Sequence, residues 1–245
     1  MDQALQSQFE MMQLPPLILT TALVLWVAWK QKSLLPIYLF LSAGIAYMAE
    51  PLSQLLGLGI YPPEGMHAVW RAFNRSVPLF GFLAYLWFLG GLSCFAYGRF
   101  IKGITTRGIF IMYVVLVVIE TILEIPGLNT STFMYYGPQP FVMMKFPVWW
   151  AFVNAGAAML AACLVFKMRD YVKPIFYPIF LWSVPLANSG IMGGAGLPVQ
   201  IALNRNDSLP VTHIAAVCTI ALCFFVIYMI ALLCATDSGA TVKGE

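Results

Sequence analysis

Seven long apolar stretches divide the chain, and short polar segments separate them. A helix of about 20 mostly apolar residues is long enough to cross the hydrocarbon core of a bilayer. The pattern therefore predicts an all-α polytopic membrane bundle, with residues 1–245 forming a single transmembrane domain. The first span is short and begins at Pro15-Pro16, because proline suits the first turn of a helix. About seven spans are expected, at residues 15–29, 34–56, 78–98, 107–125, 147–168, 174–196 and 212–234.

Composition agrees with a chain that lipid solvates. Hydrophobic residues make up 61% of it and charged residues only 9%, whereas a soluble domain is about 25% charged. The basic residues are scattered and form no stripe, which argues against a nucleic-acid partner. Membrane lipid and an apolar small molecule are the expected partners, and the oligomeric state is left open. The first ten residues carry two acids and no base, so we expect no cleaved signal peptide.

The Lys and Arg residues predict the orientation, because cytoplasmic loops carry an excess of both. If the N-terminus is outside and the C-terminus inside, nine of the 13 bases lie in inner segments and four in outer ones. The localisation expected is multi-pass, in the plasma membrane of a bacterium or the endoplasmic reticulum of a eukaryote. The inner set is Lys30, Lys32, Arg99, Lys102, Arg107, Lys167, Arg169, Lys173 and Lys243, and the outer set is Arg71, Arg75, Lys145 and Arg205.

The predicted outer loops are longer than the inner ones and rich in Gly, Pro and aromatic residues. Loops of this length in a compact protein are often functional lids. They span about 57–77, 126–146 and 197–211. They also hold three glycosylation sequons, at Asn74, Asn129 and Asn206, which matter only in a eukaryotic secretory pathway.

Three carboxylates fall in the outer halves of predicted spans: Glu50 in the second, and Glu120 and Glu124 in the fourth. An ionisable group within a span costs roughly 2.5–3.5 kcal/mol and is by default a functional hypothesis. Glu120 and Glu124 are four residues apart, so they project from one helical face. All three are candidate catalytic residues. The alternative is structural: Glu50 pairs with Arg71 or Arg75 and holds the first outer loop to the bundle.

Other polar and aromatic residues are expected near the same depth. Arg75, Tyr136, Trp150, Asn154 and Asn188 are the candidate substrate-binding residues. For each aromatic taken alone, an interfacial belt is the better interpretation. The inner halves of the predicted spans hold no Glu, Asp, His or Asn. This one-sidedness predicts a polar pocket that opens outward and is walled by spans two to six.

Carboxylic acids in such a pocket suit two kinds of chemistry. A protonated carboxyl is a general acid, and two carboxyls on one face can divide the roles of acid and base. That arrangement fits acid-catalysed ring closure of an apolar substrate, and it fits a proton-coupled transporter equally well. No metal and no cofactor is expected, because no metal-binding motif occurs and the five cysteines all lie in apolar runs.

Several short motifs follow one another along the chain: Glu50-Pro51, Leu56-Gly57, Tyr61-Pro62, Glu64-Gly65, Arg75, Pro78, Tyr85, Gly90-Gly91, Glu124-Ile125-Pro126-Gly127, Tyr135-Tyr136-Gly137, Gln139-Pro140, Phe146-Pro147, Trp149-Trp150, Phe152 and Asn154. Their order resembles the AveC-like spirocyclase family of bacterial integral membrane proteins. The resemblance covers about residues 45–205 and implies spiroketal formation, in which two hydroxyls close onto a ketone under acid catalysis. It carries no firm catalytic motif.

Two classes of function therefore compete. The first is a membrane-embedded cyclase of specialised metabolism, acting on a polyketide-like or terpenoid-like substrate. The second is a proton-coupled transporter or a lipid-binding membrane protein. Carriers usually have internal repeats and helices broken near the midplane. The sequence shows neither feature, which favours the cyclase.

Overall fold

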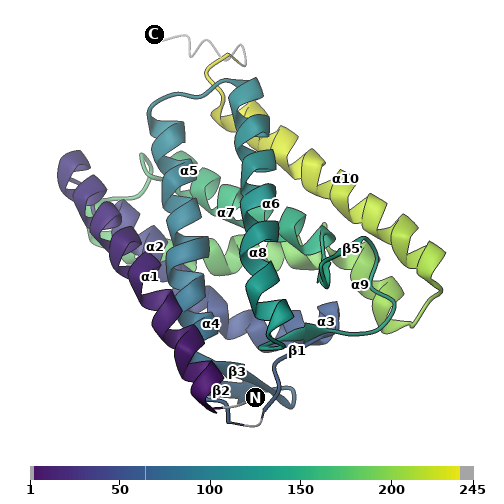
Figure 1. The fold of residues 1–245 in the computed structure, drawn as a ribbon. Coiled ribbons are helices and arrows are strands. Elements are labelled where there is room, and N and C mark those ends of the chain that lie inside the picture. Colours follow the sequence, from purple (N-terminus) through teal and green to yellow (C-terminus); the bar gives the residue numbers. More distant parts are fainter. Residues whose placement is uncertain (1–2, 64, 238–245) are drawn as a thin grey trace.

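The described part of the chain folds as a helical bundle with three small two-stranded sheets (Figure 1). The computed structural model describes residues 3–63 and 65–237. Glu64, which belongs to the family resemblance, and Lys243, one of the nine bases of the inner set, lie outside them. Among the described residues, seven helical segments are long and apolar enough to cross a membrane, which confirms the all-α class and the predicted number of spans. They are Ala4–Gln31, Leu35–Gly57, Leu79–Ile101, Thr106–Asn129, Trp149–Met168, Pro174–Gly193 and Leu209–Cys234.

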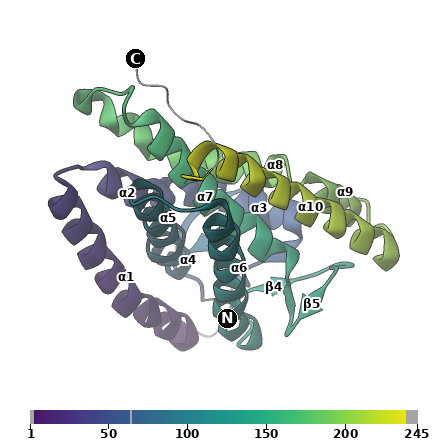
Figure 2. The same ribbon diagram turned by 90° about the horizontal axis from the view of Figure 1, so that it is seen from above.

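The first span is longer than predicted. Helix α1 runs over Gln3–Gln31, and Pro15 and Pro16 lie inside it instead of opening it. The two prolines leave the carbonyls of Met11 and Met12 without their usual helical donors. Such breaks are tolerated in spans when neighbouring groups support the helix. Figure 2 shows α1 along one edge of the bundle, where most of its large side chains are exposed.

Three of the seven spans are interrupted, which the sequence did not indicate. The second comprises α2 (Leu35–Ala46), a 3₁₀ turn η1 (Tyr47–Ala49) and α3 (Glu50–Gly57). The third comprises α4 (Leu79–Ala84), a π-helical segment η2 (Tyr85–Gly90) and α5 (Gly91–Ile101). The sixth begins with a 3₁₀ segment η3 (Pro174–Trp182) and continues as α8 (Ser183–Gly193). Prolines 51, 174 and 178 lie in or beside these breaks and cannot donate a backbone hydrogen bond.

The other spans are continuous helices, and α7 lies at the centre of the bundle. They are α6 (Thr106–Asn129), α7 (Trp149–Met168) and α10 (Leu209–Cys234). Most residues of α7 are buried, and it packs against α5, α6, α8 and α10. Small residues let helix backbones approach closely in a membrane. Gly156 and six alanines along α7 provide this close packing.

Short antiparallel ladders order the long loops at one end of the bundle. Strand β1 (Gly59–Ile60) pairs with β4 (Met134–Tyr135), and so joins the first and second of these loops. Strands β2 (Ala68–Ala72) and β3 (Arg75–Pro78) form a hairpin, as do β5 (Val142–Met143) and β6 (Phe146–Pro147). The third predicted loop, 197–211, is largely helical, because α9 occupies Leu197–Asn204.

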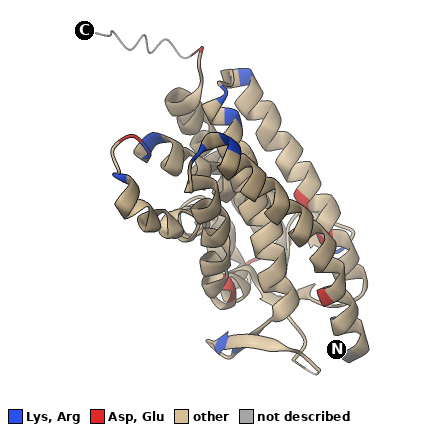
Figure 3. Ribbon diagram, turned by 90° about the vertical axis from the view of Figure 1, so that its left-hand side faces the viewer, with Lys and Arg blue, Asp and Glu red and all other residues tan. Residues whose placement is uncertain are grey.

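Most basic residues lie at the opposite end (Figure 3). Eight described bases of the predicted inner set lie in the connections α1–α2, α5–α6 and α7–η3 or in the helix ends that flank them. At this end Asp237 accepts hydrogen bonds from the Thr106 amide and hydroxyl, at 2.8 and 2.9 Å. These hydrogen bonds lower the pKa of the Asp237 carboxyl. The charge asymmetry agrees with the predicted orientation, which itself stays a prediction.

Candidate functional site

A cavity of about 470 Å³ lies between α1, the third span and α6, toward the end of the bundle that carries the long loops. We call it the large chamber. Its walls are mainly apolar and aromatic, including Phe9, Phe80, Phe88, Leu123 and Phe133. The π-helical segment η2 contributes Tyr85, Trp87, Phe88 and Leu89 to the wall. Isolated π-helical turns often occur at functional sites.

A second cavity of about 80 Å³ adjoins the first, and we call it the small chamber. The two chambers share Tyr61, Tyr85, Glu124, Phe133 and Asn154. The small chamber is more polar and reaches between α3 and the start of α7. Its other lining residues are Glu50, Ser53, Gln54, Gly59, Ile60, Tyr135 and Trp150.

All three predicted carboxylates line these chambers. Glu120 faces the large chamber, Glu50 the small one, and Glu124 both. Among the described residues, no Lys, Arg or His lines either chamber. The structure therefore brings together acidic residues from two spans around the two adjoining chambers, with no cationic side chain in the described lining.

Two tyrosines hold Glu50. The Tyr61 hydroxyl donates to Glu50 Oε1 at 3.1 Å, and the Tyr85 hydroxyl donates to Glu50 Oε2 at 2.6 Å. Glu50 follows the 3₁₀ turn η1, while Tyr85 opens the π segment, so two helix interruptions face each other at this contact. The suggested pairing of Glu50 with Arg71 or Arg75 is wrong: among the described residues no ion pair joins them, and Arg75 donates to the Tyr136 hydroxyl instead.

Glu120 has a different environment. The Asn154 side-chain amide donates a hydrogen bond to Glu120 Oε1, joining α6 to α7. Only 1% of Glu120 is exposed, and its Oε2 has no hydrogen-bond partner among the described residues. One oxygen of this carboxyl is thus positioned, and the other is free for a ligand.

The loops contribute two phenols to the site, those of Tyr61 and Tyr135. Tyr61 follows β1 and Tyr135 belongs to β4, so the β1–β4 ladder places both beside the carboxylates. Burial raises the pKa of each phenol well above its usual value, and the nearby carboxylates raise it further. Both groups therefore stay protonated and can serve as hydrogen-bond donors.

The five predicted substrate-binding residues separate into two groups. Asn154 and Trp150 line the small chamber. Arg75 lies on the surface, where it donates to the Tyr136 hydroxyl at 2.7 Å, and Asn188 is buried in α8. Arg75, Tyr136 and Asn188 line neither chamber. We leave these three out of the site developed below.

Several lining residues were missed in the sequence, chiefly Gln54, Tyr61, Tyr85 and Tyr135. Gln54 lies four residues after Glu50 and so shares its helical face, a spacing that could have indicated it. The tyrosines carry no such signal, because interfacial tyrosines are common in membrane proteins. Among the described residues, no group of three or more His, Cys, Asp or Glu side chains could hold a metal ion.

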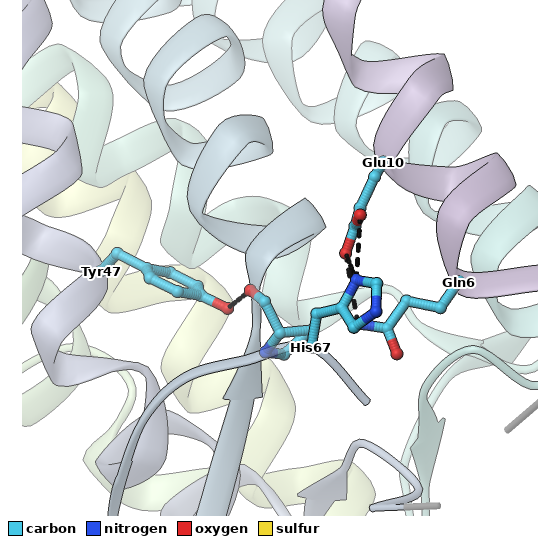
Figure 4. A network of polar contacts seen from close by, with 5 residues as sticks. Gln6, Glu10, Tyr47 and His67 are labelled. Atoms are coloured by element: carbon cyan, nitrogen blue, oxygen red, sulfur yellow. Dashed lines mark hydrogen bonds and ion pairs between the residues drawn. The ribbon is translucent and has the colours of Figure 1, made fainter. Parts of the chain in front are cut away.

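A polar contact near the start of α1 attaches this helix to the loop that precedes β2 (Figure 4). The His67 ring Nδ1 lies 3.0 Å from Glu10 Oε1, and the Gln6 amide donates to the same carboxylate at 3.3 Å. Farther along α1, the Trp87 indole donates to Gln13 Oε1 at 2.7 Å. These contacts hold in place a wall of the large chamber that is otherwise weakly packed.

Comparison with protein-family models, curated proteins and solved structures found no match for this chain.

Proposed function

We propose that the protein is a membrane-embedded cyclase that closes rings in an apolar, oxygen-bearing substrate by acid catalysis. The observation that carries the proposal is the set of three carboxylates around two adjoining chambers whose described lining residues include no Lys, Arg or His. A cavity of about 470 Å³ lies within the range of small-molecule sites. The resemblance to AveC-like spirocyclases is a separate argument for the same class, with a terpenoid cyclase as a variant.

The three carboxyls take different roles. Glu120, held through one oxygen by Asn154, donates a proton from its free oxygen to a substrate carbonyl. A substrate hydroxyl then attacks the carbonyl carbon, a C–O bond forms, and Glu124 accepts the hydroxyl proton. Glu124 then returns its proton to the hemiketal hydroxyl, whose C–O bond breaks so that it leaves as water. The second substrate hydroxyl attacks the resulting oxocarbenium carbon, the second C–O bond forms, and Glu120, now a carboxylate, accepts the proton of that hydroxyl. Glu50, with both oxygens bonded to phenols, stabilises positive charge as it develops.

The test uses the full chain reconstituted in lipid vesicles with a long-chain dihydroxyketone, and mass spectrometry to follow the loss of one water. Glu120→Gln keeps the size of the side chain but removes the acid. Because general acid catalysis contributes about 10²–10⁴-fold, we expect a loss of that order. Asp170→Asn is the control, since Asp170 is an exposed carboxyl far from the chambers in the α7–η3 connection. Unchanged turnover in Glu120→Gln would refute its role as the acid.

A second candidate, a proton-coupled carrier, gains support from the interrupted spans. Discontinuous helices at a binding site are common in secondary transporters, and two of the interruptions, η1 and η2, meet at Glu50 and Tyr85. These interruptions at the chambers weaken the case against a carrier, which was that the sequence shows no broken helices.

Proton flux separates the two candidates. A pH-sensitive dye inside the vesicles reports proton movement when the dihydroxyketone is added. A carrier moves protons while the compound stays chemically unchanged, and Glu120→Gln stops the flux. A cyclase converts the compound without net proton movement, because Glu120 and Glu124 each end the reaction in the protonation state in which they began it. Flux without conversion would overturn the cyclase proposal.

A further inference from the structure

Two buried polar side chains in the small chamber lack partners. Gln54 on α3 is 4% exposed, and neither its Nε2 nor its Oε1 has a hydrogen-bond partner among the described residues. Trp150, at the start of α7, is 6% exposed, and its indole Nε1 is likewise without one. Buried polar groups are nearly always hydrogen-bonded, and a buried group without a hydrogen bond is costly to the stability of the protein. Both side chains line the small chamber, so a group bound there would satisfy them.

The chemistry of these atoms restricts what they can bind. An indole N–H only donates, so its partner must be an acceptor, which excludes an ammonium group. Glu50 and Glu124 line the same chamber, and no described basic residue does, which disfavours a carboxylate or phosphate. Gln54 offers one donor group and one acceptor. A neutral hydroxyl can accept from Trp150 and donate to Gln54 at the same time.

We infer that the small chamber is a recognition subsite for a neutral oxygen function, above all a hydroxyl, on an otherwise apolar ligand. The hydroxyl enters between Gln54 and Trp150, and the hydrocarbon body occupies the large chamber. This inference rests on the proposed function for its substrate and identifies Gln54 and Trp150 as residues that determine specificity. Tyr61 and Tyr85 line both chambers and so mark the boundary between the site of the hydroxyl and the site of the hydrocarbon body.

The geometry supports the division into two parts. The small chamber, about 80 Å³, has room for more than one water-sized group but not for a long hydrocarbon chain. The large chamber is about 470 Å³ and mainly apolar. Glu120 lies in the large chamber, so a hydroxyl held at Gln54 leaves a more distant oxygen of the same ligand within reach of the acid.

The experiment measures binding, not turnover. The full chain in lipid nanodiscs is titrated with decan-2-ol, decane and decylammonium, none of which can form a ring. The probe signal is the indole N–H resonance of Trp150, assigned as the one missing in Trp150→Phe. We expect decan-2-ol to shift this resonance and decane to leave it in place. This binding result does not depend on the cyclase assay, so either proposal can be refuted without the other.

Gln200→Leu is the matched control for Gln54→Leu. Gln200 on α9 is 1% exposed and also lacks hydrogen-bond partners among the described residues, but it lines neither chamber. Gln54→Leu should weaken decan-2-ol binding about threefold to tenfold, the usual value of one hydrogen bond, and Gln200→Leu should not.

Three results would overturn the inference. One is an equal loss of affinity in both glutamine variants. Another is tighter binding of decylammonium than of decan-2-ol. The third is a Trp150 resonance that decan-2-ol does not move in the unmodified chain, a measurement that stands even if Gln54→Leu does not fold.

Discussion

At the scale of single residues, the site depends on close packing of glycine against aromatic rings. A Cβ atom added to Gly57 would overlap the Trp150 indole, one added to Gly127 would overlap the Phe133 ring, and one added to Gly81 would overlap the Tyr47 hydroxyl. Trp150 and Phe133 line the chambers, as do Gly81 and Gly127. The small size of these glycines therefore sets the position of the chamber walls.

Gly57→Ala tests this dependence. The new methyl group would displace the Trp150 indole, and overpacking of this kind typically costs about 1–3 kcal/mol. We expect a lower thermal unfolding temperature and weaker decan-2-ol binding. Gly98→Ala is the control, because its Cβ would meet no heavy atom within 4 Å. Alanine in that helix should be neutral or stabilising by up to about 1 kcal/mol. Equal effects of the two substitutions would contradict the packing argument.

At the scale of elements, α1 differs from the rest of the bundle. It forms one wall of the large chamber through Phe9, Met12, Gln13 and Pro16, yet most of its large side chains are exposed. It is attached to the loops and the third span by Glu10–His67, Gln13–Trp87 and the Phe9–Phe80 ring contact. Such an element opens more readily than the buried helix α7.

Removal of one attachment should loosen α1 without unfolding the protein. His67→Ala breaks the contact with Glu10, and because the His67 side chain is 43% exposed, the global cost should stay below about 1 kcal/mol. Amide hydrogen exchange in the first half of α1 should nevertheless become faster, while exchange in α7 should not change. His213→Ala is the comparison, since His213 contacts Leu209 and Phe141 instead. Faster exchange throughout the bundle would argue against a local role.

At the scale of the whole molecule, most basic residues lie at one end of the bundle and the two chambers lie toward the other. Eight described bases lie in connections or helix ends on one side, while the chambers and the ordered loops lie toward the other. If bases mark the inner side, the chambers are near the outer surface, within reach of ligands from the outer leaflet.

Labelling of single cysteines tests the orientation. In a chain without its five native cysteines, Cys is introduced at Asn74 in the β2–β3 hairpin or at Lys102 after α5. A membrane-impermeant maleimide added to intact cells should label the first and not the second. Lysed cells, in which both should react, provide the control. The reverse pattern would invert the topology and place the chambers near the inner surface.

The sequence alone determined the number of spans and their approximate limits. It also determined that three carboxylates lie in the same half of the bundle. Apolar length and helical spacing are local properties, so they can be read along the chain. The same locality explains the error at α1, where contacts with His67 and Trp87 support a helix that continues past two prolines.

Only the tertiary structure decided the partners of those carboxylates. Tyr61 and Tyr85 reach Glu50 from 11 and 35 residues away, and Asn154 reaches Glu120 from 34. The helix breaks at η1 and η2 and the β1–β4 ladder bring these side chains into contact. Each of these features depends on neighbours that are distant in the sequence. The free atoms of Gln54 and Trp150 exist for the same reason, because packing alone decides whether a buried polar group finds a partner.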